Sequence, residues 1–361
     1  MNSGAGPEGP DGLTRGACWP KKKGLCCGAS LRSRASLKGG ARQGGEKLER
    51  DGIQRKKAQG KGMAAAFVLL VVAFIWGATF TVVKEAVQEA PVFVFLSQRF
   101  LLAFVAFIPL LLRSQKGFSL HVLRQGAVLG LLLYGAYALQ TLGLVYTTAS
   151  NAAFITGLNV VLVPVFSLFA FGIRLEPHVL FGVLLAAFGL SGLCLGVDLR
   201  LNGGDCIVAL CAVCIALHIM YTGRFAGGSD VFWLAGVQLG VVGALSAASA
   251  LVQGQEPLAW VPGILWALLM CSVLASAFAF WAQTSMQRFI SPTKTAVILC
   301  MEPVFGALYA RVFGGELLGP WELAGAILVF CGMLLAVVPL PLGALAAASR
   351  RLLQRKAVLS D

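Results

Sequence analysis

The sequence predicts an all-α integral membrane protein in which ten transmembrane helices form two inverted five-helix repeats. Of its 361 residues, 58% are hydrophobic and 12% are charged. The apolar residues fall in blocks of about 20, and a helix of that length spans the hydrocarbon core of a bilayer at 1.5 Å rise per residue. A transmembrane β-barrel would instead show short segments of alternating hydrophobicity, and the sequence has none.

The predicted spans are apolar blocks bounded by polar residues, proline or glycine. In order, they cover residues 65–86, 91–112, 126–146, 149–171, 177–197, 204–223, 231–252, 259–281, 292–313 and 320–341. We assign residues 63–197 to the first repeat and residues 203–341 to the second.

Two basic segments flank the repeats. Residues 1–62 are interpreted as a disordered N-terminal tail and residues 342–361 as a cytoplasmic C-terminal tail. Met63 directly precedes the first apolar block, so we favour Met63 as the start of translation over a genuine disordered tail. A targeting peptide is the third alternative, disfavoured because acidic residues are interspersed and no apolar h-region is present.

Positive charge is concentrated in the tails, which predicts the orientation in the membrane. Residues 1–62 hold 14 Lys and Arg against 5 Asp and Glu, whereas residues 63–349 hold 11 against 10. The loops on the same side as the tails are also the more basic ones. The positive-inside rule therefore predicts cytoplasmic termini, and we expect the plasma membrane. The ten cysteines are scattered, without the spacing of a metal site or a disulfide framework.

The two halves resemble each other when the sequence is shifted by 143 residues. Gln140-Thr141 then aligns with Gln283-Thr284, and the glycines and prolines coincide, as at Gly182 and Gly325. Because five is an odd number, a second five-helix unit must be inverted relative to the first. Inverted repeats are a recurring plan of secondary transporters, whose substrate site lies near the bilayer midplane between the repeats.

Several short motifs, taken in order, resemble the drug/metabolite transporter superfamily and specifically its ten-helix EamA-type members. They are Phe74-Ile75-Trp76-Gly77, Gln98-Arg99-Phe100, Ala149-Ser150-Asn151-Ala152-Ala153-Phe154, Glu302-Pro303-Val304-Phe305 and Gly314-Gly315-Glu316. The resemblance covers about residues 65–341. One departure is Gly172-Ile173-Arg174-Leu175, where the family usually has Gly-Glu-Arg-Leu. The resemblance implies a permease for small metabolites, often an exporter, without fixing the substrate.

Glu302 is an acidic residue deep within a predicted span, followed directly by Pro303. A charged acid at the bilayer centre costs roughly 2.5–3.5 kcal/mol, so we expect its side chain to face the bundle interior or water. A carboxyl in this position is suited to proton coupling, and the alternative is a structural hydrogen bond between the ninth and tenth helices. The 143-residue offset pairs Glu302 with Asn159, which we expect on the substrate path.

Arg99 is the second costly residue, about two turns into the second helix. It is either a counter-charge for an anionic substrate or for Glu302, or it snorkels to the surface or forms a structural pair. Further candidates for the substrate path are polar or aromatic residues, for which packing between helices is the alternative: Gln140, Thr141, Gln283, Thr284, Trp76 and Tyr137. His218 lies alone within a span, where a hydrogen-bonded structural role competes with a proton relay.

The leading functional hypothesis is a secondary-active transporter that moves a small organic metabolite or drug-like solute by alternating access, in the direction of export, with protons as candidate coupling ions. The alternatives are a facilitator or a nucleotide-sugar or phosphate antiporter of the same superfamily and, from another class, a non-transporting membrane scaffold or receptor. The sequence has no P-loop and no catalytic triad, so we expect no ATP, no enzyme activity and no cofactor or metal. The expected partners are a solute and membrane lipid, not nucleic acid, and the protein is expected to be a monomer or homodimer.

Overall fold

The computed structural model describes residues 58–79, 82–83, 85–114, 118–147, 149–173, 175–193, 203–314 and 319–338. Contacts divide the chain into two units, Met1–Lys56 and Lys57–Asp361, and all described residues belong to the second. Every regular element among them is helical. The prediction of disordered tails falls largely on residues outside the described ranges.

The first repeat contains six described helices. They are Ala58–Thr79, α2 (Val92–Leu112), α3 (Leu120–Tyr146), α4 (Ala149–Gly157), α5 (Asn159–Phe171) and α6 (Pro177–Leu193). The second repeat begins with α7 (Gly203–Ala226) and α8 (Val231–Val252). A continuous helical stretch follows, made of the 3₁₀ turn η1 (Pro262–Ile264), α9 (Leu265–Ser272), the π-helical segment η2 (Val273–Phe278) and α10 (Ala279–Met286). The repeat ends with α11 (Pro292–Leu299), α12 (Glu302–Gly314) and α13 (Pro320–Val337).

Eight helical stretches are long and apolar enough to cross a membrane. The predicted spans 177–197 and 292–313 are not among them, so the structure supports an all-helical membrane protein without confirming ten spans. The described part of α6 has 17 residues, which is shorter than the roughly 20 that a membrane crossing needs. The other predicted span is divided into α11 and α12 at Cys300–Met301, just before Pro303.

Several helix boundaries differ from the prediction. The first helix begins at Ala58, so residues 58–62 are helical rather than part of a disordered tail. α3 begins at Leu120 rather than at residue 126, because Ser119 caps it: its Oγ accepts a hydrogen bond from the Val122 amide at 3.2 Å. In both places, residues 58–62 and 120–125 extend the helix beyond the apolar block that the sequence pattern detects.

The helix breaks fall at matching positions in the two repeats. α4 and α5 are separated at Leu158, and the same place in the second repeat, 143 residues later, is Met301. A proline follows each break, Pro164 in α5 and Pro303 in α12, and proline cannot donate a backbone hydrogen bond. Asn159 and Glu302 are the first residues of α5 and α12.

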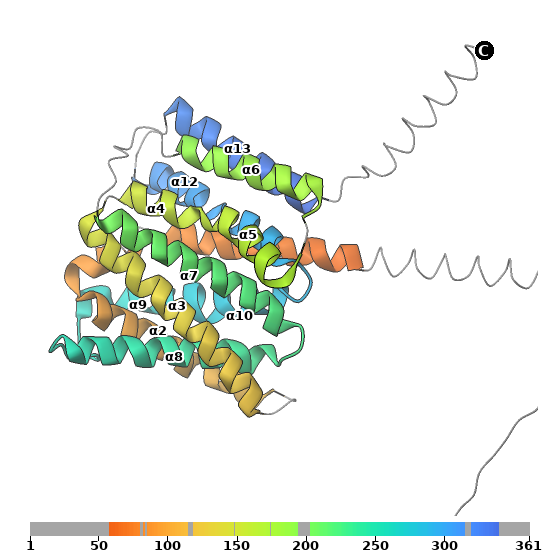
Figure 1. Cartoon of the computed structure of the whole chain (residues 1–361). Helices are drawn as coiled ribbons and strands as arrows, with labels where there is room; N and C mark the ends of the chain where they lie inside the picture. Colours follow the sequence, from red (N-terminus) through yellow and green to blue (C-terminus); the bar gives the residue numbers. More distant parts are fainter. Residues whose placement is uncertain are drawn as a thin grey trace, which may run out of the picture. The chain divides into compact units, whose positions relative to one another are not determined.

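Matching helices of the two repeats pack against each other in antiparallel fashion. A Cβ atom on Gly182 of α6 would lie 2.7 Å from the Gly332 carbonyl oxygen of α13, and one on Gly189 would lie 2.7 Å from that of Gly325. At the 143-residue offset, Gly182 corresponds to Gly325 and Gly189 corresponds to Gly332. Gly182 therefore contacts the counterpart of Gly189, and Gly189 contacts the counterpart of Gly182. This arrangement gives the pair an approximate twofold axis, and Figure 1 shows α6 and α13 side by side.

The bundle begins and ends on the same side. Met63, near the start of the first helix, and Val337, the last residue of α13, line one pocket, and Figure 1 shows both helix ends at the same end of the bundle. An even number of membrane crossings produces this arrangement. The buried core of the described residues consists of two large apolar clusters and a small third one, and Trp76 of the first helix packs against both large clusters.

Candidate functional site

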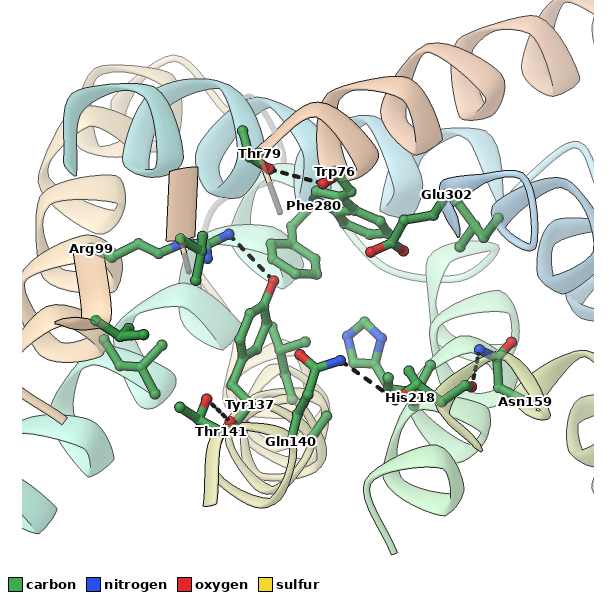
Figure 2. Close-up of a pocket in the computed structure, with 18 of the residues that line it drawn as sticks. Trp76, Thr79, Arg99, Tyr137, Gln140, Thr141, Asn159, His218, Phe280 and Glu302 are labelled. Carbon is green, nitrogen blue, oxygen red and sulfur yellow. Dashed lines mark hydrogen bonds between the residues drawn. The ribbon is translucent and has the colours of Figure 1, made fainter. Parts of the chain in front are cut away.

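A cavity of about 430 Å³ lies between the two repeats. It is walled by the first helix and residues 83–88, by α2 and α3, by the α4–α5 break, by α7 and α10, and by the α11–α12 break. Figure 2 shows Arg99 and Glu302 reaching toward the cavity from opposite sides, with the rings of Tyr137 and Phe280 between them. Each repeat therefore contributes one charged side chain to this space, and both contribute aromatic rings.

The structure brings eight of the nine predicted site residues to this cavity: Trp76, Arg99, Tyr137, Gln140, Thr141, Asn159, Gln283 and Glu302. The ninth, Thr284, does not line it. Its side chain is 1% exposed, and its hydroxyl accepts a hydrogen bond from Gln238 Nε2 at 3.2 Å. Its placement on the substrate path is corrected accordingly, and Thr284 joins α10 to α8 instead.

Arg99 is held inside the bundle by neutral groups. Its side chain is 3% exposed, so it does not snorkel to the surface. The Nε atom donates to Ser276 Oγ at 2.8 Å, and Nη2 donates to Tyr137 Oη at 3.4 Å and to the Ala275 carbonyl oxygen at 3.5 Å. The guanidinium carbon also lies 5.3 Å and 5.1 Å from the ring centres of Phe100 and Tyr137, within the range of cation–π attraction.

The π-helical segment η2 supplies the backbone acceptor at this place. The Ala275 carbonyl oxygen accepts from Trp76 Nε1 at 2.8 Å as well as from Arg99. A π-helical turn is wider than an α-helical one and leaves its carbonyls less regularly paired, and such turns are frequent at functional sites. The turn thus connects the first helix and α2, both from the first repeat, to the second repeat at the cavity wall.

Glu302 faces the cavity without a hydrogen-bond partner for its carboxyl group among the described residues. No ion pair within 4.0 Å joins it to Arg99. The first helix touches the backbone of α12 here, since a Cβ atom on Gly77 would lie 2.6 Å from the Glu302 carbonyl oxygen. Among the described residues, no hydrogen bond joins the Glu302 carboxyl group to the tenth helix, so the structural alternative stays a prediction.

Asn159 and Gln140 meet at Thr156, close to the α4–α5 break. Asn159 Nδ2 donates to the Thr156 carbonyl oxygen at 2.8 Å, and Gln140 Nε2 donates to the Thr156 hydroxyl at 3.5 Å. The Asn159 Oδ1 atom is buried and has no hydrogen-bond partner among the described residues. Thr141 is bonded within its own helix, to the Tyr137 carbonyl oxygen at 2.7 Å. The amide of one repeat thus stands at the break that matches the position of the carboxyl group in the other.

His218 also lines the cavity and belongs to a buried polar chain. Its Nε2 lies 2.9 Å from Gln238 Oε1, and Gln238 in turn donates to Thr284, so the chain crosses α7, α8 and α10. The ring packs edge-on against Phe280, with 6.0 Å between centres. This bonding supports the structural interpretation of His218.

Phe280 is a prominent wall residue that sequence reasoning missed. Its ring lies 6.4 Å from that of Tyr137 and 5.3 Å from that of Trp76. The signal was present in the repeat, because the offset that pairs Gln140 with Gln283 also pairs Tyr137 with Phe280. Among the described residues, no three His, Cys, Asp or Glu side chains gather as a metal ion would require.

Comparison with known proteins agrees with the two-repeat architecture. The EamA-like transporter family matches residues 63–195 and again residues 202–338. An uncharacterized transporter of Archaeoglobus fulgidus is 34% identical over 289 residues, covering 79% of this chain and 88% of its own length. The uncharacterized transporter YetK of Bacillus subtilis is 32% identical over 148 residues, covering 39% of this chain and 43% of its own.

A solved crystal structure shares the fold, with a TM-score of 0.64 at 21% identity, covering 76% of this chain and 96% of the other. The family model matches most of the described bundle, once in each half of the chain, in agreement with the two repeats that the 143-residue offset relates. The chain belongs to the EamA-like transporter family.

Proposed function

We propose that this membrane transporter moves a small organic solute by alternating access through the cavity between its repeats. The observation that carries the proposal is that both repeats wall one cavity, with Arg99 on one side and Glu302 on the other. The matching helices α6 and α13 pack around an approximate twofold axis. Each repeat can therefore adopt the packing arrangement of the other, and the cavity then opens to the opposite membrane face. Export is the direction we propose, and the plasma membrane the location.

Proton coupling through Glu302 is the second part of the proposal. The carboxyl group faces the cavity and has no hydrogen-bond partner in the described part of the chain, so a proton or a solute group is free to reach it. An acid that changes charge as the cavity opens and closes can link solute movement to a proton gradient.

A flux experiment with proteoliposomes tests both parts. The purified chain is reconstituted with a cell metabolite extract inside, and efflux is followed by mass spectrometry with and without an imposed pH gradient. We expect the gradient to change efflux of at least one solute, and Glu302→Gln to remove that response. Glu256→Gln, at an exposed loop residue, is the matched control and should behave as wild type.

The outcomes separate the alternatives. Unchanged flux in Glu302→Gln contradicts proton coupling and favours a facilitator. Absence of flux for every solute contradicts transport and favours a scaffold or receptor. A nucleotide-sugar or phosphate antiporter has weaker support, since Arg99 is the single Lys or Arg among the described residues that line the cavity.

A further inference from the structure

Arg99 is a buried cation without an anionic partner among the described residues. Its hydrogen-bond acceptors are a serine hydroxyl, a tyrosine hydroxyl and a backbone carbonyl, all neutral. A guanidinium has five N–H donors in a rigid fork, and these contacts use Nε and Nη2. Nη1 has no hydrogen-bond partner among the described residues, and Arg99 lines the cavity. A buried positive charge with unused donors therefore belongs to the wall of the space where a solute would sit.

Burying a charge is costly unless an opposite charge or good hydrogen bonds compensate it. Glu302 is in the same cavity but makes no ion pair with Arg99, and rings of Tyr137 and Phe280 stand between the two (Figure 2). The positive charge thus remains available to a ligand. The contacts with Ser276, Phe100 and Tyr137 hold the guanidinium in place, so little side-chain freedom is lost when an anion binds.

The surface next to Arg99 is aromatic. Tyr137 packs at 6.4 Å from Phe280, and Phe280 at 5.3 Å from Trp76, which gives a continuous wall leading from the guanidinium into the cavity. Such a wall suits an apolar or aromatic solute body. A doubly charged group fits poorly, because Arg99 is the single Lys or Arg in the described lining and Glu302 shares the space.

We propose that the cavity takes an organic monoanion, with a carboxylate bound by the Arg99 guanidinium and an apolar or aromatic body lying along Tyr137, Phe280 and Trp76. A planar carboxylate matches the fork of an arginine and accepts two parallel hydrogen bonds from it. This assignment rests on the proposed function, since it names the class of solute that the same cavity carries.

Binding of matched ligands to the full chain in lipid nanodiscs tests the assignment. The probes are 3-phenylpropionate, its uncharged amide and the cation 3-phenylpropylamine, together with hexanoate, hexanamide and hexylamine, measured by calorimetry at neutral pH. We expect at least one acid to bind about tenfold or more tightly than its amide, as a hydrogen bond to a charged group provides, and the amine to bind most weakly. This comparison needs no variant.

Variants then assign the preference to Arg99. Arg99→Gln should lower the affinity for the acid to that for the amide, and Arg99→Lys should retain part of the preference. Arg311→Gln, at an exposed arginine of α12, is the control and should bind as wild type. The proposal is overturned if no acid binds, if an amide or amine binds as tightly as its acid, or if Arg99→Gln keeps the preference.

The flux experiment described above separates this proposal from the transport function. Efflux of neutral or cationic solutes together with absent acid binding refutes the monoanion and leaves transport intact. Tight acid binding that is lost in Arg99→Gln, together with no flux of any solute, supports the anion site and refutes transport.

Discussion

At the scale of single residues, the chain tolerates the buried Arg99 because several neutral groups accept hydrogen bonds from its guanidinium. The shortest contact runs from Arg99 Nε to Ser276 Oγ at 2.8 Å, and Ser276 is fully buried. Hydrogen bonds to charged groups contribute more to stability than those between neutral groups, because an unpaired buried charge is strongly disfavoured. Ser276 therefore holds a position that apolar residues of the same size cannot replace without loss.

Replacing Ser276 by alanine tests this contribution. Ser276→Ala leaves the Nε donor of Arg99 without its acceptor, and we expect the free energy of unfolding to fall by about 1.5–3 kcal/mol. Thermal unfolding of the purified protein in one detergent measures the change. Ser191→Ala is the control, since Ser191 bonds within its own helix, to the Phe188 carbonyl oxygen, and should unfold near the wild-type temperature. Equal midpoints for both variants would contradict the role given to Ser276.

Charged residues of the site were predictable from sequence, and its aromatic and backbone parts were harder to find. Arg99 and Glu302 stand out because charges are rare in apolar spans. Phe280 is one of 23 phenylalanines, and only the repeat offset distinguishes it. Thr284 was misplaced because the sequence does not show which of two neighbouring polar residues turns toward the cavity.

At the scale of helices, glycines set the distance between α6 and α13. An added Cβ atom on Gly182 or Gly189 would meet backbone atoms of α13 and the Cβ atom of Ala336 or Leu328, none of which can move aside without the backbone. Small residues let helix backbones approach closely in membrane proteins, where van der Waals packing is a main source of attraction. A methyl group at either position must separate the two helices.

Gly189→Ala is expected to destabilise the bundle by about 1–3 kcal/mol, because a Cβ atom would lie 2.6 Å from the Val329 amide nitrogen. The matched control is Gly203→Ala at the start of α7, where nothing lies within 4 Å of the added atom. Both variants are compared with wild type by thermal unfolding in the same detergent. A midpoint for Gly189→Ala equal to that of the control would show that the helices separate without cost.

Hydrophobic blocks predicted where most helices lie but not how they are interrupted. The blocks containing Pro164 and Pro303 were each predicted as one helix, and the structure divides both. The π-helical segment of residues 273–278 contains no proline or glycine from which an interruption of the helix could be predicted. One of its carbonyls, that of Ala275, accepts hydrogen bonds from Trp76 and Arg99, which are distant in sequence, and local patterns do not reveal such contacts.

At the scale of the whole molecule, the inverted arrangement fixes which loops share a membrane face. In the predicted topology with a cytoplasmic N-terminus, the α7–α8 loop is cytoplasmic and the α8–α9 loop lies on the outer face. α8 is an apolar stretch of 22 residues between them, enough to cross the hydrocarbon core.

Cysteine labelling of intact cells tests this orientation. A membrane-impermeant maleimide should label Gln253→Cys, in the α8–α9 loop, in intact cells, and label Gly227→Cys, in the α7–α8 loop, only after permeabilisation. Gln253 is exposed, and an added Cβ atom on Gly227 meets nothing within 4 Å, so neither change should disturb the fold. Wild-type protein gives the background from native cysteines. The reverse labelling pattern would contradict cytoplasmic termini.

The π-helical segment also makes the two repeats unequal. Its counterpart in the first repeat, residues 130–135, continues α3 as a regular α-helix. If the repeats exchange packings, either the wide turn must straighten or Trp76 and Arg99 must give up the Ala275 carbonyl. The inward-facing and outward-facing forms then differ in free energy. We therefore expect the cavity of the solute-free protein to be open mostly to one membrane face, and to open to that face again after each transport cycle.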